Sequence, residues 1–251
     1  MMRLIHFRDD AEILRCISEL TDVPQDRVVR FVEGLVDKNV GGNPHMDYWR
    51  QFQAEFGVDL KISGTVYFHG CRCPRFTKFE QGLLPNHQAI DLIWLQLWQI
   101  VGDRIGAVNV EELKSQFIAK PGRWRGDYHD RLSRSIRERG PWGKLVRPEW
   151  FMEGTNSDHY LKNAPEIVLI ILNHFSPDGS LHEIYRNETA PCIVHFKTTG
   201  KDELALGHGL LYLRDKRHCR YPAQYTFAYG LGSMCGVAIP PEDILEVEYL
   251  G

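Results

Sequence analysis

The chain has 251 residues and a formal net charge of −3, with 43% hydrophobic and 25% charged residues. This length suits one globular domain with added elements, or a core plus a small helical appendage. The composition is ordinary for a globular protein. So small a net charge does not call for a nucleic-acid or membrane partner through bulk electrostatics.

The apolar runs and the cysteines indicate where in the cell the protein is located. No apolar run has the length that a bilayer requires, and the first ten residues lack the apolar core of a signal peptide. Six cysteines are too few for a disulfide framework in a chain of this length, so we expect reduced, mostly buried thiols. These features predict a cytoplasmic protein with no membrane partner.

The first 60 residues are predicted to be helical. Apolar residues recur at helical spacing through residues 28–36, after Pro24 and Asp26, which are typical of a helix start. A second short helix is expected over residues 48–56, with Gly57 as its C-terminal cap. We therefore expect an N-terminal helical region of residues 1–60.

The character of the sequence changes after this region. Residues 61–70 are rich in β-branched and aromatic side chains and end at Gly70, which predicts a strand. A short helix is expected over residues 76–82. From about 88 to 175 the chain is mainly helical in pattern, because apolar residues recur at helical spacing.

The last third of the chain turns to strands. We expect strands over residues 192–196, 209–213, 235–239 and 244–250, and a helix over residues 221–229. Helices, a strand, a helical stretch and then several strands do not alternate as in a doubly wound sheet. The order therefore favours the α+β class.

Three segments carry a resemblance to a known family. The first is Tyr67-Phe68-His69-Gly70-Cys71-Arg72, followed by Gly82-Leu83, and its glycine lets a ligand approach the backbone closely. It resembles the opening of the diphtheria-toxin and poly(ADP-ribose) polymerase branch of the ADP-ribosyltransferases. That opening is an apolar strand, His-Gly-Ser/Thr, often Arg, and further on Gly-Leu. Cys71 stands where the family has a hydroxyl residue.

The other two segments come late in the chain. Gly207-His208-Gly209 leads into Tyr212, and Tyr225 follows, which resembles the family's second element with its nicotinamide-stacking tyrosines. Residues 244–249 resemble the closing strand that carries the family's glutamate. Glu246 and Glu248 would share one face of that strand, because side chains alternate. The pattern does not choose between them, and Glu246 is the first choice because more strand follows it.

The resemblance implies an ADP-ribosyltransferase-like catalytic domain over residues 61–251. Its core would be a split antiparallel sheet, preceded by the N-terminal helices and interrupted by a helical insertion at about 88–175. NAD is the implied substrate. The implied NAD-binding residues are His69, Gly70, Cys71, Arg72, Tyr212 and Tyr225, and the implied catalytic residues are His69, Tyr212, Glu246 and Glu248.

These residue types suit cleavage of the nicotinamide–ribose bond. That reaction passes through an oxocarbenium-like state, as other glycosyl transfers do. By the resemblance, the Gly70 backbone pairs with the nicotinamide amide and His69 positions the adenosine ribose. The tyrosines would stack on the nicotinamide ring. Glu246 or Glu248 would bond the ribose and offset its developing positive charge.

Structural explanations compete with each of these roles. His69 could be a strand-end histidine satisfied by local hydrogen bonds, the tyrosines could be core aromatics, and the glutamates could be the solvated face of an edge strand.

Zinc binding by His69, Cys71 and Cys73 is a further alternative, since these residues would share one face of a strand. Structural zinc usually requires Cys-x-x-Cys spacing and a fourth ligand, so we predict no metal.

A locally basic segment covers residues 123–147, with aromatic side chains among its arginines. Such a mixture can bind phosphates and stack bases, although acidic residues dilute it and an ordinary solvated helix is the competing interpretation. We expect an acceptor to dock on Arg123, Arg131 and Arg134.

The sequence thus predicts an NAD-dependent ADP-ribosyltransferase, in a toxin, defence or modification role. It would transfer ADP-ribose to a protein or nucleic-acid acceptor or hydrolyse NAD. One alternative is an RNA 2′-phosphotransferase-like enzyme that transfers the phosphate to NAD. The other is a non-catalytic nucleic-acid or protein-binding module that uses the basic segment.

Overall fold

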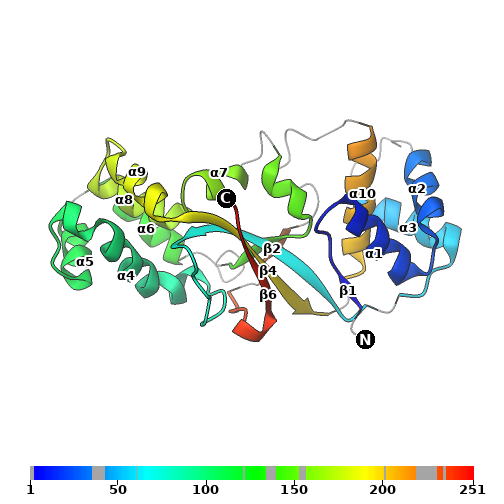
Figure 1. Cartoon of the computed structure of the whole chain (residues 1–251), viewed down its shortest axis with the longest axis horizontal. Coiled ribbons are helices and arrows are strands. Elements are labelled where there is room, and N and C mark those ends of the chain that lie inside the picture. The colour runs from blue at the N-terminus through cyan, green and yellow to red at the C-terminus, as the bar shows by residue number, and fades with distance from the viewer. Residues whose placement is uncertain are drawn as a thin grey trace. The chain divides into compact units, whose positions relative to one another are not determined.

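The structure is a computed structural model, and it describes residues 3–35, 43–60, 62–120, 122–133, 140–152, 157–200, 202–218, 231–233 and 236–251. These residues form helices and a mixed sheet (Figure 1), which confirms the predicted α+β class. The helix predicted over residues 221–229 lies outside the described residues.

The chain divides into two compact units, each assembled from three separate segments. The first consists of Met1–Phe68, Gly143–Ser157 and His195–Gly232, and the second of His69–Trp142, Asp158–Val194 and Ser233–Gly251. The division into residues 1–60 and 61–251 stays a prediction.

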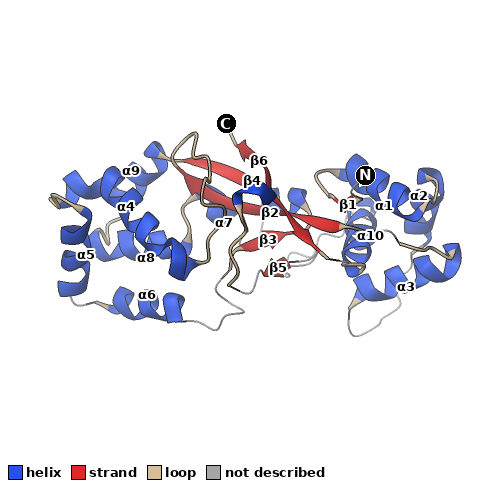
Figure 2. Cartoon of the chain, turned by 90° about the horizontal axis from the view of Figure 1, so that it is seen from below, coloured by secondary structure: helices blue, strands red, loops and turns tan. Residues whose placement is uncertain are grey.

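The strands form one mixed sheet (Figure 2). Strands β5, β3, β2, β4 and β6 follow one another in that order, and β1 pairs in parallel with β2. Strands β2 and β4 continue from one unit into the other. Strands predicted over residues 61–70, 192–196 and 244–250 are confirmed. The bounds are Leu4–Ile5 for β1, Gly64–Cys73 for β2, Trp142–Lys144 for β3, Ala190–Thr199 for β4, Leu231–Ser233 for β5 and Ile244–Tyr249 for β6.

The first unit contains four helices among its described residues. They are α1 (Asp10–Thr21), α2 (Gln25–Gly34), α3 (Pro44–Phe56) and α10 (Leu204–Arg217). The side chain of Asp9 accepts a hydrogen bond from the Glu12 amide and caps α1. Gly57 ends α3 in the left-handed region, with φ +62°, as the sequence predicts.

Helix α10 corrects one prediction, because residues 209–213 are helical and not a strand. Gly207 allows α10 to pack directly on α3, since a Cβ there would lie 2.2 Å from the carbonyl oxygen of His45. A Cβ at Gly209 would lie 2.7 Å from the ring of Phe7. The Gly-x-Gly step therefore serves close packing of a helix, and tertiary contacts override the local preference for a strand.

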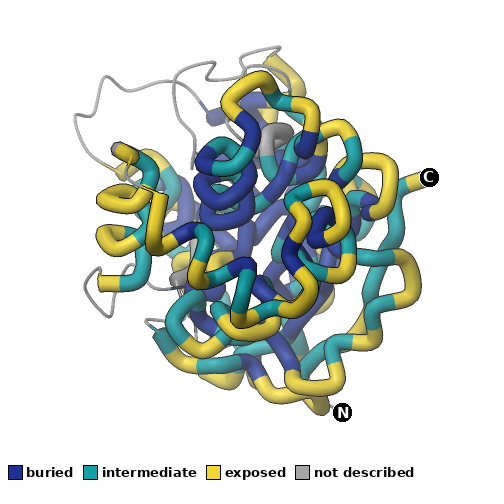
Figure 3. The backbone as a smooth tube through the Cα atoms, turned by 90° about the vertical axis from the view of Figure 1, so that its left-hand side faces the viewer, coloured by how far each residue is buried: buried dark blue, intermediate teal, exposed yellow. Residues whose placement is uncertain are grey.

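The second unit has its own helical core. Figure 3 looks towards these helices, with buried stretches in dark blue and exposed stretches in yellow. The helices are α4 (Asn86–Ile105), α5 (Val110–Ala119), α6 (Arg123–Ser133), α8 (Glu166–Phe175) and α9 (Ser180–Glu188), and α7 (Ser157–Lys162) begins at the boundary between the units. The core they share contains Trp94, Leu97, Val101, Leu113, Phe117, Ile167, Val168, Ile171, Leu172 and Tyr185.

Two further predictions are wrong. Residues 76–82 are not helical, because Phe76 and Phe79 adopt left-handed backbone angles, with φ of 68° and 51°, that interrupt a helix. Residues 236–238 are not a strand, and Ile239 forms only an isolated bridge with Leu83. The sequence also did not predict α9, β3 or the 3₁₀ helices Arg147–Phe151 and Pro241–Asp243.

Candidate functional site

His69 lies inside β2 and not at its end, because the strand continues to Cys73. Its Nδ1 lies 2.6 Å from the carbonyl oxygen of Trp142, so Nδ1 carries the hydrogen and donates it. This bond leaves Nε2 as an acceptor. Burial lowers the pKa of His69, and the bond to Trp142 opposes that shift. The imidazole is therefore neutral near pH 7 and held in one tautomer.

Three thiols meet beside His69. Cys71 and Cys73 stand two residues apart on β2, and Cys192 faces them from the neighbouring strand β4. The Sγ atom of Cys192 lies 3.3 Å from that of Cys71 and 3.6 Å from that of Cys73. All three Sγ atoms lie within 4.8 Å of one another, and all three residues are buried.

The thiols share their hydrogen bonds unequally. The pKa of Cys73 is lowered, because the Cys192 and Cys71 thiols both donate towards its sulfur. The pKa of Cys71 is raised by its bonds to the other two thiols and by burial. The cluster therefore favours a single thiolate on Cys73, stabilised by its two neighbours.

The sequence predicted Cys71 but missed Cys192. Cys71 was expected to replace a hydroxyl in the NAD site, which stays a prediction, and the structure places its sulfur in the thiol cluster. Cys192 is 121 residues away from Cys71 along the chain. The sequence of β4 shows no pattern typical of metal ligands. Only the pairing of β4 with β2 brings Cys192 to the other two thiols.

The side chain of Arg72 is bound by backbone carbonyl groups. Its guanidinium donates to the carbonyl oxygens of Leu161 at 2.7 Å, Arg186 at 2.8 Å and Thr189 at 3.0 Å. These oxygens belong to α7 and to the C-terminal end of α9. A cation at a helix C-terminus satisfies its unpaired carbonyls and complements its dipole. Arg72 thus fastens two helix ends to β2.

The last strand lies close to the segment that follows the His-Gly pair. The hydroxyl of Tyr249 donates to the carbonyl oxygen of Thr77 at 3.1 Å and lies 3.9 Å from Sγ of Cys73. Side chains alternate along a strand, so Glu246 and Glu248 lie on the opposite face of β6 from Tyr249. Glu246 is exposed and Glu248 half-buried. His69, in turn, shares the face of Cys71 and Cys73 on β2.

Tyr212, one of the two predicted tyrosines, lies in α10 of the first unit. The Tyr212 ring is 1% exposed in α10, and its hydroxyl donates to Oδ1 of Asp10 at 3.0 Å. Tyr225 lies outside the described residues. The described contacts of Tyr212 are those of a packed core residue.

The basic segment is only partly described. Arg131 forms an ion pair with Glu166, and Arg125 donates to the carbonyl oxygen of Ile118 at 3.1 Å. Arg134 lies outside the described residues, as does the side chain of Arg123. The docking surface for an acceptor stays a prediction.

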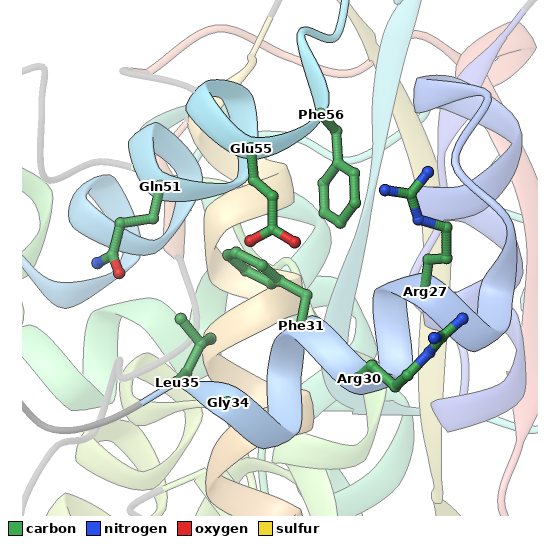
Figure 4. A pocket seen from close by; sticks show the side chains of 8 residues that line it. All are labelled: Arg27, Arg30, Phe31, Gly34, Leu35, Gln51, Glu55 and Phe56. Atoms are coloured by element: carbon green, nitrogen blue, oxygen red, sulfur yellow. The ribbon is translucent and has the colours of Figure 1, made fainter.

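A pocket lies in the first unit, between α2 and α3 (Figure 4). The guanidinium of Arg27 sits 4.9 Å from the centre of the Phe56 ring, and Arg30 pairs with Asp26. Both cations are therefore engaged within the protein, and the pocket contains none of the residues predicted from the sequence. It is lined by Arg27, Arg30, Phe31, Gly34, Leu35, Gln51, Glu55 and Phe56.

Comparisons with known proteins return no relative. No family model matches the chain, no curated protein matches it, and no solved structure matches it. Within the described ranges, no helix is both long enough and apolar enough to cross a membrane.

Proposed function

We propose that the chain is a cytoplasmic, NAD-dependent ADP-ribosyltransferase whose site lies in the second unit around His69. One observation carries the proposal. The segment between the two halves of the family-like pattern, His69 to Arg72 and Gly82-Leu83, contacts the strand that carries the candidate glutamates. Tyr249 bonds Thr77 between the two halves, and Leu83 pairs with Ile239 ahead of β6.

The state of His69 supports a role in binding a sugar. A neutral imidazole whose Nδ1 is fixed by a carbonyl presents Nε2 as an acceptor for a ribose hydroxyl. The backbone of Gly70 would pair with the nicotinamide amide, as the resemblance implies. Cys71 and Arg72 contribute to the site through packing, since their polar groups are bound to the thiol cluster and to helix ends.

A glutamate on β6 would stabilise the oxocarbenium-like ribose. Glu246 is exposed on β6, the last strand in the order of the sheet, on the opposite face from Tyr249, so the proposal requires NAD to reach it from His69 around the sheet edge. A carboxylate placed there offsets positive charge as the glycosidic bond breaks. Tyr212 has no part in this proposal, because its ring and its hydroxyl are engaged in the first unit. Tyr225 remains the proposed stacking residue.

Release of nicotinamide from NAD tests the proposal. We expect the parent protein to release it, His69→Ala to abolish release, and Glu246→Gln or Glu248→Gln to reduce it about 100-fold or more. Glu242→Gln, an exposed residue before β6, is the matched control and should retain the parent rate. Circular dichroism checks that each variant is folded. A parent protein that neither binds NAD nor releases nicotinamide would overturn the proposal.

Assays on the same purified protein identify the acceptor and test the two alternative functions. Labelled NAD shows whether ADP-ribose reaches a protein, a nucleic acid or water. Transfer of an RNA 2′-phosphate to NAD, or nucleic-acid binding without NAD cleavage, would each replace the proposal with one of the two alternatives.

A further inference from the structure

We propose that Cys71, Cys73 and Cys192 bind one thiophilic d¹⁰ metal ion, Zn²⁺ or Cu⁺, through three thiolates. This inference does not depend on the proposed NAD chemistry. Thiolates are the protein ligands that select zinc and cuprous ions over hard cations such as Mg²⁺ and Ca²⁺.

The spacing of the sulfurs is already close to that of a thiolate site. A Zn–S bond is about 2.3 Å long, so two sulfurs on a tetrahedral zinc lie about 3.8 Å apart. The Sγ atom of Cys192 lies 3.3 Å and 3.6 Å from the other two, and no pair exceeds 4.8 Å. Changes of about 1 Å or less in the sulfur separations would therefore accommodate an ion.

The strands fix this arrangement before any ion binds. Cys71 and Cys73 point to one face of β2 because they are two residues apart, and Cys192 comes from the adjoining strand β4. Ligands on regular strands lose little conformational freedom on binding, which favours affinity. The two cysteines on β2 do not have Cys-x-x-Cys spacing. The third thiol comes from the neighbouring strand β4.

Metal binding would displace the protons of the three thiols, because the thiolate and not the thiol is the form that binds a metal ion.

Metal titration of the reduced, metal-free full chain tests the inference. We expect one Zn²⁺ or Cu⁺ per chain by elemental analysis, and an ultraviolet sulfur-to-metal charge-transfer band when Co²⁺ replaces the ion. Cys192→Ser should lower affinity about 100-fold or more, because loss of even an outer-shell partner costs 10- to 100-fold. Cys16→Ser is the matched control. This thiol is buried in α1 and bonds the Leu4 carbonyl, so its loss should leave affinity unchanged.

X-ray absorption spectroscopy of the loaded parent protein needs no variant, and it also distinguishes the two ions. Three sulfur neighbours alone indicate Cu⁺, whereas three sulfurs with a fourth ligand indicate Zn²⁺. A spectrum without sulfur neighbours would overturn the inference, as would equal affinity in Cys192→Ser or a Cys71–Cys192 disulfide whose reduction yields no metal binding.

This outcome is separate from that of the proposed enzyme. Nicotinamide release reports on His69 and the β6 glutamates, whereas metal affinity reports on the three thiols. If the chain binds the ion but does not cleave NAD, the metal site is supported and the proposed activity is refuted. If it cleaves NAD but does not bind the ion, the proposed activity is supported and the metal site is refuted.

Discussion

The carbonyl oxygen of Ile239 would lie 1.8 Å from a Cβ atom at Gly82. The next residue, Leu83, exchanges two backbone hydrogen bonds of 2.9 Å with Ile239, and these hold the two segments together. Gly82 also has φ +76°, a conformation that other residues rarely adopt. Packing alone therefore requires a glycine here, whether or not the Gly-Leu step also serves a ligand.

Gly82→Ala should destabilise the protein by about 3–5 kcal/mol, because it combines a strained φ with a clash against backbone. Gly106→Ala is the matched control, since Gly106 has φ +79° but no atom within 4 Å of its Cβ position. That control should cost only about 1 kcal/mol. Urea unfolding measures both, and equal losses would contradict the packing explanation.

Gly207→Ala should cost about 2–4 kcal/mol, because the new methyl group would force α10 away from α3 at His45. Gly126→Ala in α6 provides the comparison, since its Cβ position is open. Alanine is the better helix former, so that variant should gain up to about 1 kcal/mol. Thermal unfolding would detect the opposite signs. A Gly207→Ala protein as stable as the parent would refute the role of Gly207 in helix packing.

Arg72→Met should cost about 2–4 kcal/mol, because it leaves the carbonyls at the ends of α7 and α9 without their charged donor. Arg72→Lys should recover only part of this, since an ammonium cannot span three oxygens as the planar guanidinium does. Arg75→Met, at an exposed position three residues on, should change stability by less than about 0.5 kcal/mol. Chemical denaturation of the three variants checks the order, and an Arg72→Met protein no weaker than Arg75→Met would contradict it.

Glu149 should make stability depend on pH. Its carboxylate lies 3.1 Å from Nζ of Lys144, and both residues are buried. Burial raises the pKa of Glu149 from 4.5 to about 7, with Lys144 opposing the shift. The folded state therefore holds this proton more tightly than the unfolded state does. The free energy of unfolding should then fall as pH rises from about 4.5 to about 7, by about 3 kcal/mol for this group.

Glu149→Gln removes this titration and is the variant to compare. Urea unfolding at several pH values should give a parent-minus-variant difference that declines across this window and is constant above it. The buried histidines titrate in both proteins, so their effects cancel. A difference that is independent of pH would show that Glu149 does not keep its proton in the folded state.

Local patterns alone determined much of this protein. The spacing of apolar side chains predicted the helices near residues 48–56 and 88–175, and β-branched runs predicted β2, β4 and β6. Gly57 is the cap that its position suggested. These features follow from contacts within a few residues, which a sequence records directly.

Only the tertiary structure decided the rest. Residues 209–213 read as a strand by composition, yet Gly207 lets them pack as a helix against α3. Arg72 sits in a ligand-like pattern but binds helix ends that lie far along the chain. Cys192 joins Cys71 across 121 residues because β2 and β4 are neighbours in the sheet. Such long-range pairings depend on how the elements assemble, and a local pattern carries no information about them.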